Sequence, residues 1–117
     1  MQVAMIIFPF GFYVLEGKRP IYVGNDLQAQ EAVLTWMDAN QDKVPLRFDI
    51  VGPPQIVTKF LGWNAAFPSV SMDQAPLLFE ATLEVDGQVA VRHLYNDYDA
   101  ALMGHADLIE GAKGRLQ

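Results

Sequence analysis

Residues 77–95 have the sequence LLFEATLEVDGQVAVRHLY, which contains the strongest local structural signal of the chain. Two runs rich in large apolar and β-branched residues flank the pair Asp86 and Gly87. This pair favours a two-residue type I′ turn, because both central residues of that turn adopt positive φ angles. The segment is therefore predicted to form a β-hairpin, with Glu80 opposite His93 across the two strands.

Further strands are predicted on the N-terminal side of this hairpin, each a short apolar or alternating run. The expected strands cover residues 3–8 (ended by Pro9), 12–15, 21–23, 44–51 and 56–61, with 12–15 and 21–23 pairing as a short hairpin. In strand 44–51, Leu46, Phe48 and Ile50 alternate with Arg47 and Asp49. This alternation is typical of a half-buried strand whose apolar face packs on a core.

Two helices are predicted from apolar residues spaced at the helical period. The first has a cap at position 25 or 26 and extends to about residue 39, with Leu27 and Leu34 on its apolar stripe. The second has a cap at position 96 or 97 and carries His105 on its apolar stripe. A buried histidine at such a position packs while a ring N–H bonds a nearby carbonyl more often than it binds a metal.

The length and composition are those of one globular domain. The chain has 117 residues and a mass of 13.0 kDa, with 51% apolar and 19% charged residues. A chain of this size folds around one core. We expect residues 1–117 to form a single α+β domain, with an antiparallel sheet of about five or six strands and two helices packed on one face.

Several classes of chemistry have no support in the residue content. The absence of cysteine excludes disulfides, thiolate metal sites and cysteine nucleophiles. Ser69 and Ser71 lie in no nucleophile motif, and no glycine-rich phosphate loop is present. Asp97 and Asp99 are spaced like the start of a calcium loop but lack its later glycine and glutamate. We therefore assign no catalytic residue and expect no cofactor and no metal.

The apolar run at residues 3–15 is the one candidate for a targeting or membrane segment. It is broken by Pro9 and Gly11 and is shorter than the roughly 20 residues that a helix needs to span a bilayer. It also lacks the basic start and the cleavage site of a signal peptide. We expect a cytoplasmic protein that makes no membrane contact.

Acidic residues are concentrated in one part of the chain. The net charge is −6 at pH 7 and the pI is near 4.6, a balance that disfavours direct binding of nucleic acid. Residues 73–110 hold eight carboxylates and one basic residue. Glu84, Asp86, Asp99 and Asp107 are expected to be the most exposed. They form either a surface for a basic protein partner or a solubilising face.

An irregular segment at residues 62–76 contains the other candidate binding residues. Trp63, Phe67 and Met72 are interspersed there with prolines, serines and other polar residues. A loop of this length is uncommon without a role or packing of its own. The three side chains either anchor a partner or fold back over the sheet.

Three motifs in the second half of the chain resemble a group of short, uncharacterised proteins from bacterial and phage genomes. These motifs are IVTKFLGWN (56–64), PLLFEATLE (76–84) and YNDYDAALMGHADLIE (95–110). The likeness covers about residues 56–110. It implies a phage or mobile-element setting and brings no established activity with it.

The leading hypothesis is a small acidic interaction protein without catalysis that binds a basic protein surface. In a phage setting this would be an inhibitor of a host defence or nucleic-acid-binding complex, similar in strategy to anti-CRISPR proteins. One alternative is a small enzyme or ligand-binding domain that uses His93 with Glu80, or His105, beside the loop from Trp63 to Met72. Another is a homodimer with a structural role.

Overall fold

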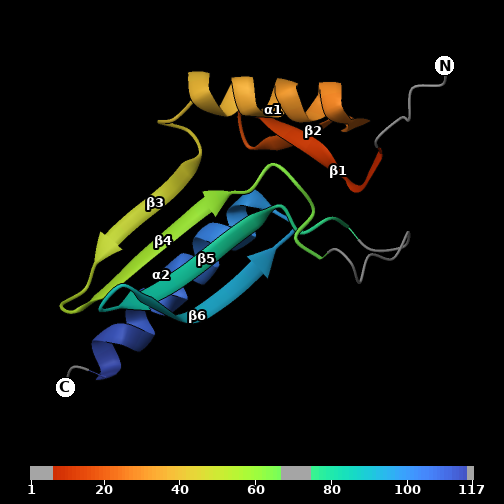
Figure 1. Ribbon diagram of the computed structural model, residues 1–117. Coiled ribbons are helices and arrows are strands. Elements are labelled where there is room, and N and C mark those ends of the chain that lie inside the picture. The colour runs from red at the N-terminus through yellow and green to blue at the C-terminus, as the bar shows by residue number, and fades with distance from the viewer. Residues whose placement is uncertain (1–6, 67–74, 116–117) are drawn as a thin grey trace, which may run out of the picture.

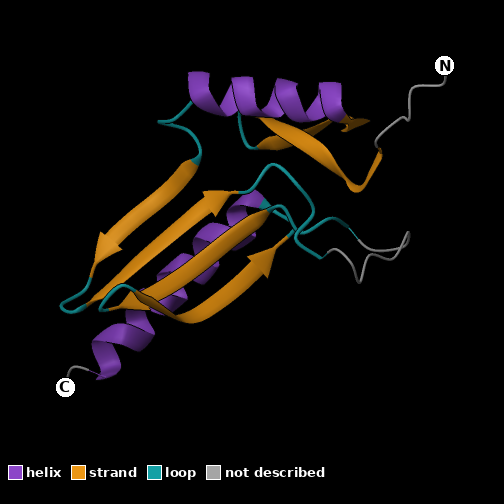
Figure 2. Ribbon diagram, viewed as in Figure 1, coloured by secondary structure: helices purple, strands orange, loops and turns teal. Residues whose placement is uncertain are grey.

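The computed structural model describes residues 7–66 and 75–115, and within them the chain forms two β-sheets, each with one helix packed on it (Figures 1 and 2). The elements are β1 (Ile7–Glu16), β2 (Arg19–Asp26), α1 (Leu27–Ala39), β3 (Pro45–Ile50), β4 (Pro54–Phe60), β5 (Phe79–Val85), β6 (Gln88–Tyr95) and α2 (Tyr98–Arg115).

The strands are divided between two antiparallel sheets. β1 and β2 form a hairpin, and the other sheet has the order β3-β4-β5-β6. α1 packs on the hairpin, whereas α2 covers one face of the four-stranded sheet (Figure 1). The predicted α+β class is confirmed. The prediction of one sheet with both helices on one face is wrong. β1 and β2 form a separate sheet, and α1 packs on that sheet rather than on the four-stranded one.

The first strand also differs from its prediction. β1 passes through Pro9 and continues to Glu16, so Pro9 does not end it. The pairing with β2 is irregular around Phe12, and Gly11 has a φ angle of 67°. These irregularities let the strand continue past a residue that cannot donate a backbone hydrogen bond. The predicted start of this strand at residues 3–6 lies outside the described part of the chain.

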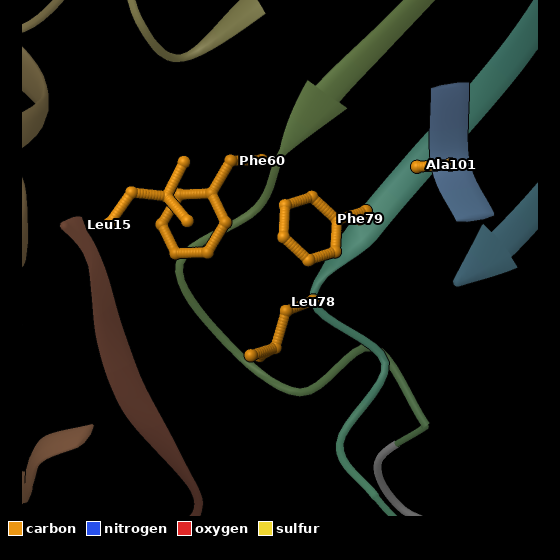
Figure 3. Close-up of a cluster of buried hydrophobic side chains, with 5 residues drawn as sticks. All are labelled: Leu15, Phe60, Leu78, Phe79 and Ala101. Carbon is orange, nitrogen blue, oxygen red and sulfur yellow. The ribbon is translucent and has the colours of Figure 1, made fainter. Parts of the chain in front are cut away.

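The hairpin and α1, which we call the hairpin layer, meet the four-stranded sheet at a cluster of buried side chains: Leu15, Phe60, Leu78, Phe79 and Ala101 (Figure 3). Phe60 is 1% exposed, and its ring lies 5.5 Å from the ring of Phe79 and 5.9 Å from that of Trp36. Because Trp36 belongs to α1 and Phe79 to β5, this one side chain connects the hairpin layer to the four-stranded sheet.

Local signals at the element ends are confirmed. Asp86 and Gly87 have φ angles of 54° and 79°, as a type I′ turn requires. The carboxylate of Asp26 accepts a hydrogen bond from the backbone of α1, and that of Asp97 caps α2 in the same way. Such caps satisfy backbone N–H groups that have no partner within the helix.

The predicted register of the β5–β6 hairpin is wrong by one residue. Glu80 pairs with Leu94, and Ala81 pairs with His93. The pairing shifts between Leu83 and Glu84, where Ala90 on the facing strand has no partner. This bulge places Glu80 and His93 on opposite faces of the sheet.

Apolar residues are exposed on two elements where burial was expected. Leu27 and Leu34 of α1 are 50% and 59% exposed, because the helix turns Ala29 and Val33 toward the hairpin instead. In β3, Leu46 packs against the core as predicted, but the pairing shifts between Pro45 and Arg47, and beyond this shift the faces are reversed. Phe48 and Ile50 are 55% and 64% exposed, and Asp49 faces α2.

Candidate functional site

The four carboxylates predicted to bind a partner lie far apart in the fold. Glu84 and Asp86 are at the turn between β5 and β6, whereas Asp99 is in the first turn of α2, at the opposite end of β6. The Asp99 carboxylate is 3.0 Å from the Lys18 ammonium of the β1–β2 turn. Asp107 lies midway along α2. The four side chains therefore make no single cluster.

Other carboxylates of the same stretch are engaged within the chain. Glu80 is almost buried, where it accepts a hydrogen bond from Arg92 and lies 3.9 Å from Lys59. Asp97 is used as the cap of α2. Glu110 is 3.8 Å from Lys113. Asp73 lies outside the described residues.

The two histidines have different surroundings. His93 is exposed, 3.5 Å from the Tyr95 hydroxyl, and it cannot form the predicted pair with Glu80 across the sheet. His105 is completely buried between α2 and the sheet. Its Nδ1 lies 2.7 Å from the Thr58 hydroxyl on β4, and its Nε2 lies 2.7 Å from the Asp49 carboxylate on β3.

This His105 bridge (Thr58, His105, Asp49) has a defined direction of donation. A carboxylate only accepts, so Nε2 donates to Asp49, and in the neutral imidazole Nδ1 accepts from the Thr58 hydroxyl. The bond from His105 is the main cause that holds the pKa of Asp49 below its ordinary value of 3.8, and the nearby Arg47 adds to it. The predicted bond of His105 to a carbonyl is replaced by these two side-chain bonds.

The His105 bridge resembles a hydroxyl–imidazole–carboxylate arrangement in its residue types, but no substrate can contact its reactive end. Thr58 and His105 are both 0% exposed. A nucleophile has to reach a reacting atom at about 3 Å. The bridge therefore holds α2 against β3 and β4, a structural role that the sequence analysis did not foresee.

Trp63 marks an apolar hollow on the surface. Its side chain is 37% exposed beside a hollow of about 220 Å³ that extends toward α1. A second hollow of about 410 Å³ adjoins the first, and both are lined by Leu34 and Met37. We name the two hollows together the α1 groove. Phe67 and Met72, the other predicted anchors, lie outside the described residues.

Carboxylates flank the α1 groove. Asp38 lines it directly, and Glu31 and Asp38 stand three residues before and four residues after Leu34, so all three share one side of the helix. Asp42 follows shortly after α1 and lines a neighbouring hollow together with Lys43. From residue 20 to residue 42 the chain contains four acidic residues and no basic one. The lining of the groove is thus mainly apolar, with the amides of Gln30 and Gln41 and with Asp38 as its charged residue.

Gly62 allows the groove wall to approach α1. Its φ angle is +83°, and a Cβ there would lie 2.5 Å from the Met37 methyl and 3.1 Å from a Val33 methyl. Gly62→Ala is expected to lower the free energy of unfolding by about 2–3 kcal/mol, through backbone strain and crowding together. Urea denaturation measures the change.

Gly87→Ala provides the control for that variant. Gly87 has a similar φ angle of +79°, but nothing lies within 4 Å of an added Cβ. Its substitution therefore reports the strain alone, about 1 kcal/mol. An equal loss for both variants would contradict the close approach of Gly62 to α1.

The chain matches no family model, no curated protein and no solved structure. In the described ranges, 7–66 and 75–115, no group of three or more acidic or histidine side chains could hold a metal ion. No helix in those ranges is long and apolar enough to cross a membrane.

Proposed function

We propose that the protein is a non-enzymatic interaction protein whose α1 groove binds a basic amphipathic helix of a partner protein. The observation that supports this function is the combination of exposed apolar side chains, Leu34 and Trp63, with the carboxylate of Asp38 in the lining of the groove. Exposed aromatic and aliphatic side chains beside a hollow are the usual anchors of a protein interface.

The shape of the groove favours a helix as the bound element. The two hollows lie along α1, whose 13 residues span about 20 Å. A second helix laid beside α1 would insert its apolar side chains between Leu34, Met37 and Trp63. Such helix-in-groove recognition uses apolar residues spaced at three and four positions along the bound helix.

The charge of the groove edge favours a basic partner. Glu31, Asp38 and Asp42 would attract lysine or arginine residues on the flanks of the bound helix. The net charge of −6 adds a longer-range attraction, to which Glu84, Asp86 and Asp107 contribute. A partner of this kind agrees with the predicted basic protein surface. Inhibition of a nucleic-acid-binding complex in a phage remains one form that this function could take.

A designed peptide tests the proposal without knowledge of the natural partner. The probe is an 18-residue amphipathic helix with leucines on one face and lysines on both flanks. We expect it to bind with a dissociation constant in the micromolar range, and Leu34→Lys is expected to weaken binding at least about tenfold. Fluorescence of Trp63 in a Trp36→Phe background follows the titration at low and at physiological salt.

Two controls isolate the groove and its charge. Met103→Lys introduces the same charge on α2, where Met103 is 70% exposed, and should bind the peptide nearly as well as the wild type. A peptide with glutamates in place of the lysines should not bind. Equal binding by Leu34→Lys and Met103→Lys would contradict the groove. A loss confined to lysine substitutions at Glu84, Asp86 and Asp107 would move the site to those carboxylates.

A further inference from the structure

One face of the four-stranded sheet is left without a covering element among the described residues. α2 packs on the opposite face, and Figure 1 shows the sheet from the open side with the helix behind it. Three large apolar side chains are exposed there: Phe48 and Ile50 on the edge strand β3, at 55% and 64%, and Val89 on the other edge strand β6, at 53%. Exposed apolar groups gathered on one sheet face mark an interaction surface.

The strand register arranges this open face in three rows that cross the sheet. Within a row the side chains are direct neighbours on paired strands. The rows are given in the strand order β3, β4, β5, β6. The first row is Ile50, Gln55, Glu84 and Val89, and the second row is Phe48, Val57, Thr82 and Arg92. The third row contains Lys59 on β4, Glu80 on β5 and Leu94 on β6.

We propose that the open face binds a second copy of this chain, related by a two-fold axis that lies between the sheets and parallel to the strands. This operation places β3 over β6 of the second copy. Each row then faces the same row of the second copy. Ile50 of each copy then contacts Val89 of the other copy, so this apolar contact occurs twice in the dimer. Phe48 meets Arg92, whose guanidinium packs favourably on an aromatic ring.

Charges on the face are complementary under the same operation. Lys59 of one copy lies over Glu80 of the other, which is almost buried beneath Lys59 and Arg92 of its own chain, and Gln55 lies over Glu84. An axis perpendicular to the strands would instead place Glu84 over Glu80, which brings like charges together. The two cations, Lys59 and Arg92, balance the two carboxylates on this face. Two copies can therefore meet here although each carries a net charge of −6.

The twist of β-sheets is compatible with these contacts. Packed sheets lie with their strands about 30° apart. At an edge strand, about 7 Å from the axis, this rotation shifts a side chain by about 3.5 Å along the facing strand. That shift is about half the spacing between side chains on one face of a strand. Ile50 thus stays within reach of Val89 of the second copy.

Sedimentation equilibrium from about 10 to 500 μM tests the proposal. We expect the wild type to dimerise with a micromolar dissociation constant, because the face is small. Ile50→Lys and Val89→Glu should each be at least tenfold weaker. Their equimolar mixture should regain a dimer of twice 13.0 kDa, because the introduced lysine and glutamate face each other across one contact. Circular dichroism checks that both exposed-site variants fold.

Leu34→Lys is the matched control, since Leu34 is 59% exposed but belongs to α1. It should dimerise like the wild type, which separates this face from the α1 groove. A wild type that stays monomeric at 500 μM, or a dimer that survives both single substitutions, would overturn the proposal. If both single variants are monomeric and their mixture stays monomeric, the alignment of β3 over β6 is wrong.

Discussion

Replacing Phe60 with alanine is expected to lower the free energy of unfolding by about 3–5 kcal/mol, the range for truncating a buried aromatic side chain. The ring of Phe60 packs between Trp36 of α1 and Phe79 of β5, and Leu15 of β1 belongs to the same cluster. Truncation would leave a cavity where the hairpin layer meets the four-stranded sheet. A domain of this size has a stability of about 5–15 kcal/mol, so the loss is a large fraction of the total.

The position of Phe60 also predicts how the variant unfolds. In a Trp63→Phe background, Trp36 is the only tryptophan, and its fluorescence reports on α1. Fluorescence and far-ultraviolet circular dichroism should coincide during urea denaturation of the background protein. In Phe60→Ala the fluorescence transition should move to lower urea than the dichroism transition. Phe60→Leu should lose only about 1–1.5 kcal/mol. A loss below 1 kcal/mol for Phe60→Ala would contradict the joining role.

Features specified by neighbouring residues could be predicted from the sequence. The turn at Asp86 and Gly87 depends on two residues that tolerate positive φ, and the start of α1 depends on the carboxylate of Asp26. Both are decided within four residues. The division of the strands into two sheets depends on which distant strands pair, and the periodicity of a strand contains no information about its partner.

The face that a strand buries is likewise decided at a distance. Alternation showed that Phe48 and Ile50 share one side of β3, with Asp49 on the other. The buried side is the one that faces α2, where the buried ring of His105 bonds to Asp49. The register of the β5–β6 hairpin depended on the bulge at Ala90, a residue with no signal for a bulge.

The candidate site was found only in part. Trp63 stood out as an aromatic residue in an irregular segment, and it lines the α1 groove. Leu34 was assigned to the apolar stripe of the first helix, because helical spacing does not distinguish a core residue from an exposed one beside it. The absence of basic residues between positions 20 and 42 was available in the sequence and would have indicated the carboxylates beside the groove.

Replacing His105 with leucine is expected to lower the free energy of unfolding by about 3 kcal/mol. The substitution leaves the buried Thr58 hydroxyl without its partner and removes the bond from α2 to Asp49. Adding Thr58→Val to the leucine variant should restore part of the stability, because removing both members of a buried polar pair costs less than removing one. Thr58→Val alone should be destabilising.

The dependence of stability on pH distinguishes the loss of the His105 bridge from a simple loss of packing. His105 donates to Asp49 and lowers its pKa below 3.8, so the bond stabilises the fold above that pH. This contribution disappears as the pH falls through the lowered pKa of the folded state. The difference in stability between the wild type and His105→Leu should therefore shrink as the pH falls below 4, as followed by urea denaturation from pH 5 to pH 2. Arg47, 2.8 Å from the same carboxylate, is present in both proteins and cancels in the comparison. A difference that stays constant over this range would show that the imidazole acts only by filling space.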